Sequence, residues 1–125
     1  ELYHAGVIAL SEFVEMPRDN DILVRIIIKK DGRRAAYAAQ RRSGTDFPLI
    51  ACCVAKKEGT WYVSVGARPS RAEVVEVAAA DGKVDCGAVA EHFRYGDNTR
   101  GSAEYRRHLT EVYAGRLMKQ LGGEV

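Results

Sequence analysis

The fold is decided by the stretch Leu49-Ile50-Ala51-Cys52-Cys53-Val54-Ala55-Lys56-Lys57-Glu58-Gly59-Thr60-Trp61-Tyr62-Val63-Ser64-Val65. Its first half, from Leu49 to Lys56, is a short apolar run of the length and composition of a buried strand. Its second half alternates apolar and more polar residues from Trp61 to Val65, and this period of two predicts another strand with one wetter face. Glu58-Gly59 lies between the halves, where the chain has to turn.

Two further strands are expected before this stretch. Residues 22–28 form a near-continuous β-branched run, which predicts a strand. Asp31-Gly32 suits a tight hairpin turn because glycine tolerates positive φ. The return strand is expected over residues 34–41, although its many alanines leave a helix possible there.

After residue 65 the pattern changes to a helical period. We expect helices over residues 71–80, with Ser70 as a plausible N-cap, and over 86–95 and 102–121. The last helix has an apolar stripe at helical spacing: Tyr105, Leu109, Val112, Tyr113, Leu117 and Leu121. Strands followed by helices predict an α+β fold, a three- to four-stranded, mostly antiparallel sheet with three helices packed on one face.

Composition indicates one soluble globular domain. The chain has 125 residues, 46% of them hydrophobic and 29% charged. No apolar run is long enough to span a bilayer, and no signal peptide is visible at the N-terminus. The three cysteines are a poor disulfide framework, so we expect them to be reduced in a cytoplasmic protein. Cys52 and Cys53 are adjacent in a strand, and their side chains should therefore point to opposite faces.

Charge is unevenly distributed along the chain. Residues 29–57 hold eight Lys or Arg against two Asp, whereas residues 1–28 hold two Arg against five acidic residues. The basic excess could attract phosphate or an acidic partner, or it could simply mark solvated strand edges and hairpin ends. A pI near 8.5 and the lack of an aromatic strand motif argue against nucleic acid, which leaves a small RNA-binding domain as a minor alternative.

No catalytic motif stands out. His4, His92 and His108 have no metal-ligand spacing, and Gly66-Ala67-Arg68 lacks the repeated glycines of a nucleotide-binding loop. No serine has the setting of a nucleophile elbow. The residues by themselves indicate a non-catalytic domain.

Three segments together resemble one family. They are 41–49 (RRSGTDFPL), 65–72 (VGARPSRA) and 97–109, which contains Asp97-Asn98 and Gly101-Ser102-Ala103-Glu104-Tyr105-Arg106-Arg107-His108-Leu109. In this order and at similar spacing they resemble the C-terminal domain of the flavoprotein subunit of molybdenum hydroxylases, the family of xanthine and carbon monoxide dehydrogenases. The resemblance implies that residues 1–21 are the tail of a preceding FAD-binding domain or a linker, and that 22–125 form the C-terminal domain.

The resemblance also implies cofactors and partners. FAD would be held mostly by an N-terminal FAD-binding domain of the same chain, and molybdopterin and 2Fe–2S clusters by partner subunits; we expect no cofactor on this fragment alone. This domain would support the flavin and subunit packing, and would not be catalytic in isolation. The alternative is a stand-alone α+β interaction module without flavin.

By family position, the residues that touch the flavin would be Leu10 and Ala38. Family members usually have a basic residue at the position of Ala38. Alanine cannot supply a charge-assisted hydrogen bond to the flavin. We interpret Arg42 and Asp46 as a structural ion pair. Tyr105 should be buried with the apolar stripe, and Arg106 should face away from it.

Overall fold

The computed structural model describes residues 1–17, 20–78 and 83–125. The chain divides into two compact units, Glu1–Asp31 and Gly32–Val125. The boundary between the two units lies after Asp31. Within the described ranges, no helix has the length and apolar character needed to cross a membrane.

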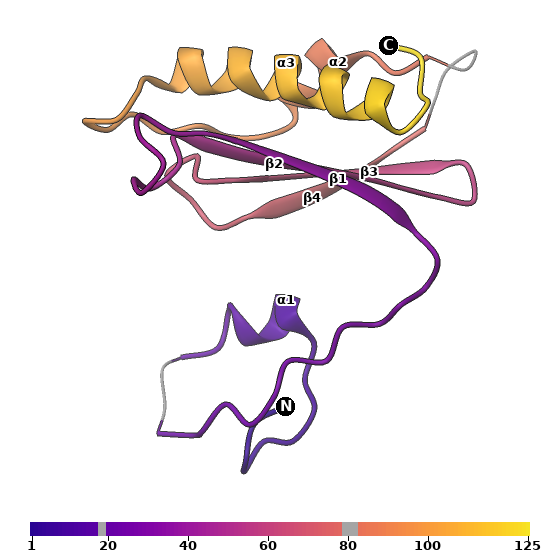
Figure 1. Cartoon of the computed structure of the whole chain (residues 1–125). Coiled ribbons are helices and arrows are strands. Elements are labelled where there is room, and N and C mark those ends of the chain that lie inside the picture. The colour runs from indigo at the N-terminus through magenta and orange to yellow at the C-terminus, as the bar shows by residue number, and fades with distance from the viewer. Residues whose placement is uncertain (18–19, 79–82) are drawn as a thin grey trace. The chain divides into compact units, whose positions relative to one another are not determined.

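The second unit is built on a four-stranded antiparallel sheet in the order β1-β2-β3-β4 (Figure 1). The strands are β1 (Arg34–Gln40), β2 (Ile50–Lys57), β3 (Thr60–Gly66) and β4 (Glu73–Val77). Lys57 pairs with Thr60, which leaves Glu58-Gly59 as a two-residue turn, and both turn residues have positive φ. That geometry matches the twist of the two strands, so the expected hairpin is confirmed. The Ala-rich segment is strand β1 rather than a helix.

Two expected elements are wrong. Residues 22–28 form no strand: apart from one isolated bridge between Leu2 and Leu23, this run has no partner strand in its unit. The expected helix over 71–80 is replaced by β4, while its last two residues lie outside the described ranges. Val75 and Val77 explain the change, because period-two spacing lets both pack against the core from the edge next to β3.

Helices α2 (Cys86–Glu91) and α3 (Ala103–Gln120) follow the sheet and lie over one of its faces (Figure 1). The Asp85 carboxylate caps α2 by accepting from two backbone amides, and the Ser102 hydroxyl caps α3 by accepting from the Tyr105 amide. The α+β fold, with helices after an antiparallel sheet, is thus confirmed. Of the three helices expected after the sheet, two are present in the described ranges, and α2 is shorter than expected.

The core lies between the sheet and the helices. Alternate strand positions, such as Cys52, Val54, Val63 and Val65, are fully buried on the helix-facing side. Cys52 belongs to this core while Cys53 is half-buried on the other face, as the strand alternation predicted. Across that other face, register aligns four residues in a row: Tyr37, Cys53, Ser64 and Val74.

The buried side of α3 differs from the expected stripe. Leu117 is buried as predicted, but Tyr105 is 44% exposed and Arg106 only 1%. The expected burial of Tyr105 and the outward orientation of Arg106 are therefore both wrong. The inward side of the helix begins with Arg106, Thr110 and Ala114, because the Arg106 guanidinium has hydrogen-bond acceptors beneath the helix.

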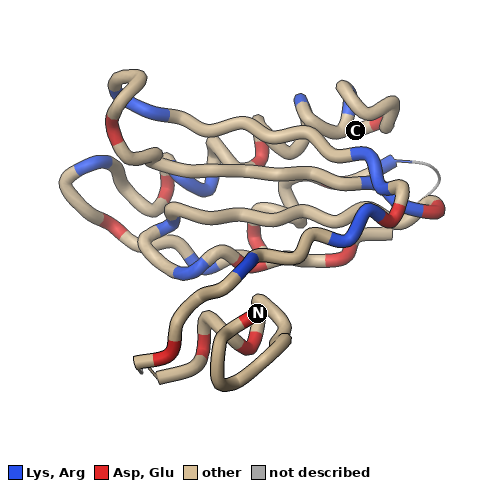
Figure 2. The backbone as a smooth tube through the Cα atoms, turned by 60° about the horizontal axis from the view of Figure 1, so that its bottom comes forward, with Lys and Arg blue, Asp and Glu red and all other residues tan. Residues whose placement is uncertain are grey.

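The basic excess of residues 29–57 is not one patch. Arg34 lies opposite Lys56 in the strand register at one end of the sheet. Arg41 and Arg42 follow the opposite end of β1. Figure 2 shows Lys and Arg mainly at the ends of the strands, with the middles largely free of them. This distribution agrees with solvated strand ends.

The first unit contains one short helix, α1 (Leu10–Phe13), and little core. Leu2 is its one buried hydrophobic residue in the described ranges. The Asp21 carboxylate accepts hydrogen bonds from the amides of His4 and Ala5, and so joins the start of the unit to residue 21.

Candidate functional site

The three segments that resemble the flavoprotein family meet at one end of the sheet. Residues 41–49 connect β1 to β2, residues 65–72 leave β3, and residues 97–109 lead into α3. Because β1, β2, β3 and β4 are antiparallel neighbours, the end of β1 and the start of β2 lie at the same end as the end of β3. We call this meeting point of the three segments the motif junction.

Arg106 is the centre of the motif junction. Its Nε donates to the carbonyl oxygen of Leu49 at 2.8 Å, and one terminal nitrogen donates to the carbonyl oxygens of Gly96 and Gly101, each at 2.5 Å. The other terminal nitrogen donates to Asn98 Oδ1 at 2.6 Å. One buried side chain therefore ties the last residue of the β1–β2 connection to the loop before α3.

The acceptors around Arg106 are neutral. Desolvation lowers the pKa of Arg106 from its ordinary value, and the negative charge of Asp97 opposes that change. A guanidinium remains charged at any physiological pH, so the buried charge is stabilised by hydrogen bonds to carbonyl and amide oxygens rather than by a paired carboxylate. If the N–H donors of Arg106 were removed, these carbonyl and amide oxygens would lose their hydrogen-bond partner.

Arg68 holds the second segment in a similar way. Its side chain is buried, and it donates to the carbonyl oxygen of Arg94 at 2.7 Å and to that of Arg71 at 2.9 Å. It also pairs with Glu73 at 2.5 Å. The Gly96 amide donates to the Arg68 carbonyl oxygen at 2.7 Å, so the loop before α3 is fixed from both sides, by Arg68 and by Arg106.

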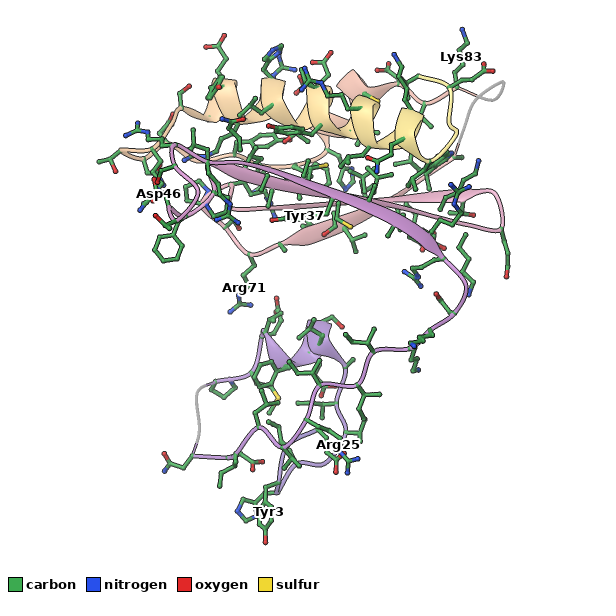
Figure 3. The ribbon with its side chains drawn as sticks, viewed as in Figure 1. Tyr3, Arg25, Tyr37, Asp46, Arg71 and Lys83 are labelled. Carbon is green, nitrogen blue, oxygen red and sulfur yellow. The ribbon has the colours of Figure 1, made fainter. Side chains whose placement is uncertain are left out.

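The expected ion pair between Arg42 and Asp46 is wrong. Arg42 instead donates to the carbonyl oxygens of Thr99 and Arg100, at 3.1 and 3.2 Å. Asp46 faces Arg100 at 3.5 Å, and the Arg100 guanidinium lies over the Phe47 ring at 5.5 Å (Figure 3 labels Asp46). The reason is tertiary: residues 97–101 lie against the 41–49 loop, so both charged groups find partners across the junction instead of each other.

The junction is built to hold loops together. The buried guanidinium donors go to backbone carbonyls, one amide oxygen and one carboxylate. Within residues 1–17, 20–78 and 83–125, no group of three or more His, Cys, Asp or Glu residues could hold a metal ion. Chemically, the arrangement positions segments; it presents no nucleophile beside a base in the contacts described.

The structure places the two family-predicted flavin contacts in different units. Leu10 opens α1 in the first unit and is 72% exposed. Ala38 lies in β1, opposite Cys52, and packs against the core on the helix-facing side. Neither side chain carries a polar group, so these residues alone do not fit a flavin ring that needs hydrogen-bond donors.

The pKa of the Cys52 thiol lies far from its ordinary value. Burial raises the pKa of its thiol to about 12, with smaller contributions from Cys53 and Cys86. A thiol with so high a pKa stays protonated at neutral pH and is a poor nucleophile. Cys52 therefore acts as a small core residue.

Comparison with known proteins gives no match: no family model, no curated protein and no solved structure matches this chain.

Proposed function

We propose that this chain is the C-terminal domain of the FAD-binding subunit of a molybdenum hydroxylase, an electron-transfer enzyme with molybdopterin, iron–sulfur clusters and FAD. The observation that carries the proposal is the motif junction. The three segments that resemble the family lie far apart in sequence, yet contacts of Arg42, Arg68 and Arg106 bring them to one end of the sheet. Segments that must fit one another in three dimensions explain why a family would keep them together in a fixed order.

In this proposal the domain supplies position rather than chemistry. Flavin chemistry belongs to the cofactor, and the protein around it contributes binding, orientation and electrostatics. FAD would be held by the preceding FAD-binding domain, with molybdopterin and 2Fe–2S clusters on partner subunits, in the cytoplasm. This domain would brace the flavin-holding domain and help the subunits to pack.

In this proposal, Leu10 and Ala38 make only apolar contact with the flavin region. Ala38 packs against the core, so it leaves any charged contact to the flavin to other residues. Arg41 and Arg42, which stand near it in sequence, already donate to backbone carbonyls within the motif junction. We therefore place the charged flavin contacts on the FAD-binding domain.

The test is purification of the full-length parent protein with its partners, followed by analysis of flavin, iron and molybdenum. The proposal expects all three, together with no stoichiometric FAD binding by the isolated 125-residue chain. A parent that lacks flavin would refute it. Tight FAD binding by the isolated chain would refute the division of labour between the two domains.

A stand-alone interaction module without flavin is the second candidate. Ala38 favours it, because the basic residue usual in the family is missing. The reading frame upstream of Glu1 separates the two candidates: a FAD-binding domain there supports the first, and a methionine start directly before Glu1 supports the second.

A further inference from the structure

A pair of lysines lies at the boundary between the two units. Lys29 and Lys30 end the first unit together with Asp31, and Gly32 begins the second. Two successive basic residues therefore stand where the chain passes from one compact unit to the next. Lysine and arginine are the residues that proteases with a carboxylate in their specificity pocket recognise before the bond they cut.

The backbone around the lysines has no regular structure. Residues 26–33 lie outside helices and strands, and the chain enters β1 as a coil (Figure 1). In the described contacts, residues 26–30 form no backbone hydrogen bond with other backbone groups. A protease binds residues on both sides of the cleaved bond in extended form, as an added strand. Residues 26–30 can take that form without loss of any helix or strand.

Arginines in the loops of the second unit are held differently. Arg68 donates to the carbonyl oxygens of Arg71 and Arg94, at 2.9 and 2.7 Å. Arg42 donates to the carbonyl oxygen of Arg100 at 3.2 Å. Cleavage after a residue requires its carbonyl oxygen to enter the oxyanion hole of the protease. At these three arginines that oxygen is already bound, so cleavage there has to break contacts of the motif junction first.

Strand β1 protects the second basic pair of the boundary, Arg33 and Arg34. Arg34 is the first residue of β1 and lies opposite Lys56 in the register with β2. A protease that cuts after Arg33 or Arg34 has to bind residues of β1 in its own cleft, and β1 must leave β2 before it can do so. The sheet therefore directs cleavage to the lysine pair.

We infer that Lys29-Lys30 is a cleavage site for a protease specific for basic residues. Water hydrolyses the peptide bond after Lys29 or Lys30, which leaves a carboxylate on that lysine and a new amino group on the following residue. All members of the hydrophobic core cluster lie between Ala36 and Leu121, so the longer fragment keeps its core. Cleavage separates the two units and leaves the second one folded. It requires neither flavin nor a partner subunit, and therefore holds or fails independently of the proposed function.

The test is limited digestion of the native 125-residue chain with trypsin, followed over time by mass spectrometry. We expect the first cut after Lys29 or Lys30, at least about tenfold faster than any cut inside a strand or inside α3. The emission of Trp61 should stay unchanged as the long fragment forms, because Trp61 is buried in the second unit. A first cut at any other residue would overturn the assignment, and a shift of the Trp61 emission would show that the second unit does not stay folded.

Two double variants make the digestion specific. Lys29→Gln with Lys30→Gln removes both recognised charges, and should slow release of the long fragment at least about tenfold. Arg33→Gln with Arg34→Gln is the matched control on the other side of Asp31-Gly32, and should release it as fast as the wild type. Unchanged release from the lysine variant, or equal slowing in both variants, would show that the lysine pair is not the site.

Discussion

Arg106 Nε donates to the carbonyl oxygen of Leu49 at 2.8 Å, across 57 residues of sequence. Leu49 immediately precedes β2, and Arg106 stands in the first turn of α3. This contact therefore links the central hairpin of the sheet to the longest helix. It also joins the first and third of the segments that resemble the flavoprotein family.

Arg106→Lys should lower the free energy of unfolding by at least about 3 kcal/mol, because one ammonium cannot serve acceptors on Leu49, Gly96, Gly101 and Asn98. Arg107→Lys is the matched control. Arg107 is a surface residue paired with Glu91 at 3.0 Å, so its replacement should cost less than about 1 kcal/mol. Urea unfolding followed by Trp61 fluorescence measures both; equal effects would contradict the central role of Arg106.

Gly123→Ala should destabilise the second unit by about 1–3 kcal/mol, since a Cβ there would stand 2.6 Å from Trp61 Cζ2 and 3.2 Å from the Met118 carbonyl oxygen. Gly44→Ala is the control, because a Cβ at Gly44 meets nothing within 4 Å. Thermal unfolding should separate the two variants, and Gly123→Ala should also shift the Trp61 emission. An unchanged emission would show that Gly123 is not packed on the indole.

Stability should fall as pH rises above about 9, in part because of Cys52. Its pKa is about 12 in the folded chain against 9.0 as the ordinary value, so the unfolded chain loses this proton first. The stability is present below pH 9 and is lost as pH rises toward 12. At pH 10 this one group accounts for about 1.4 kcal/mol.

Cys52→Ala should remove that part of the loss between pH 8 and pH 10, measured by urea unfolding under reducing conditions. Cys53→Ala retains the fully buried thiol and should keep most of the wild-type loss. If both variants lost stability with pH as steeply as the wild type, burial of Cys52 would not be its cause.

Residues 32–125 should fold without the first unit. All members of the hydrophobic core cluster, from Ala36 to Leu121, lie in this range. Deleting residues 1–31 should therefore leave the unfolding free energy within about 0.5 kcal/mol of the full chain. The deletion also removes the exposed isoleucines, so the shorter chain should stay soluble at higher concentration. Loss of cooperative unfolding would show that the first unit contributes to the core.

Sequence patterns correctly predicted the elements that depend on residues close together in the chain. The hairpin of β2 and β3 follows from alternation on either side of Glu58-Gly59, and α3 follows from Ser102 at its start and Gly122-Gly123 after its end. Strand propensity misled at 22–28, because a strand exists only where another strand pairs with it. Helix-start signals at Pro69 and Ser70 misled in the same way, since the edge of β3 was available to Val75 and Val77.

The motif junction shows the same limit at the level of single side chains. Hydropathy places an arginine on the outside of a helix and a tyrosine in an apolar stripe. In the structure Arg106 is buried and Tyr105 is exposed. The oxygens that accept hydrogen bonds from the Arg106 guanidinium belong to Leu49 and to residues 96–101. Asp46 likewise pairs with Arg100, from a loop that sequence spacing does not bring near it.

The sequence by itself determined the α+β class, the hairpin at Glu58-Gly59, the start of α3 and the opposite orientations of Cys52 and Cys53. Each depends on neighbours within a few residues, through turn geometry, capping or strand alternation. Only the tertiary structure decided that β4 replaces a helix, that residues 22–28 form no strand and that Arg106 is buried. Those outcomes depend on strand edges and hydrogen-bond acceptors from distant parts of the chain, which become neighbours only when the chain folds.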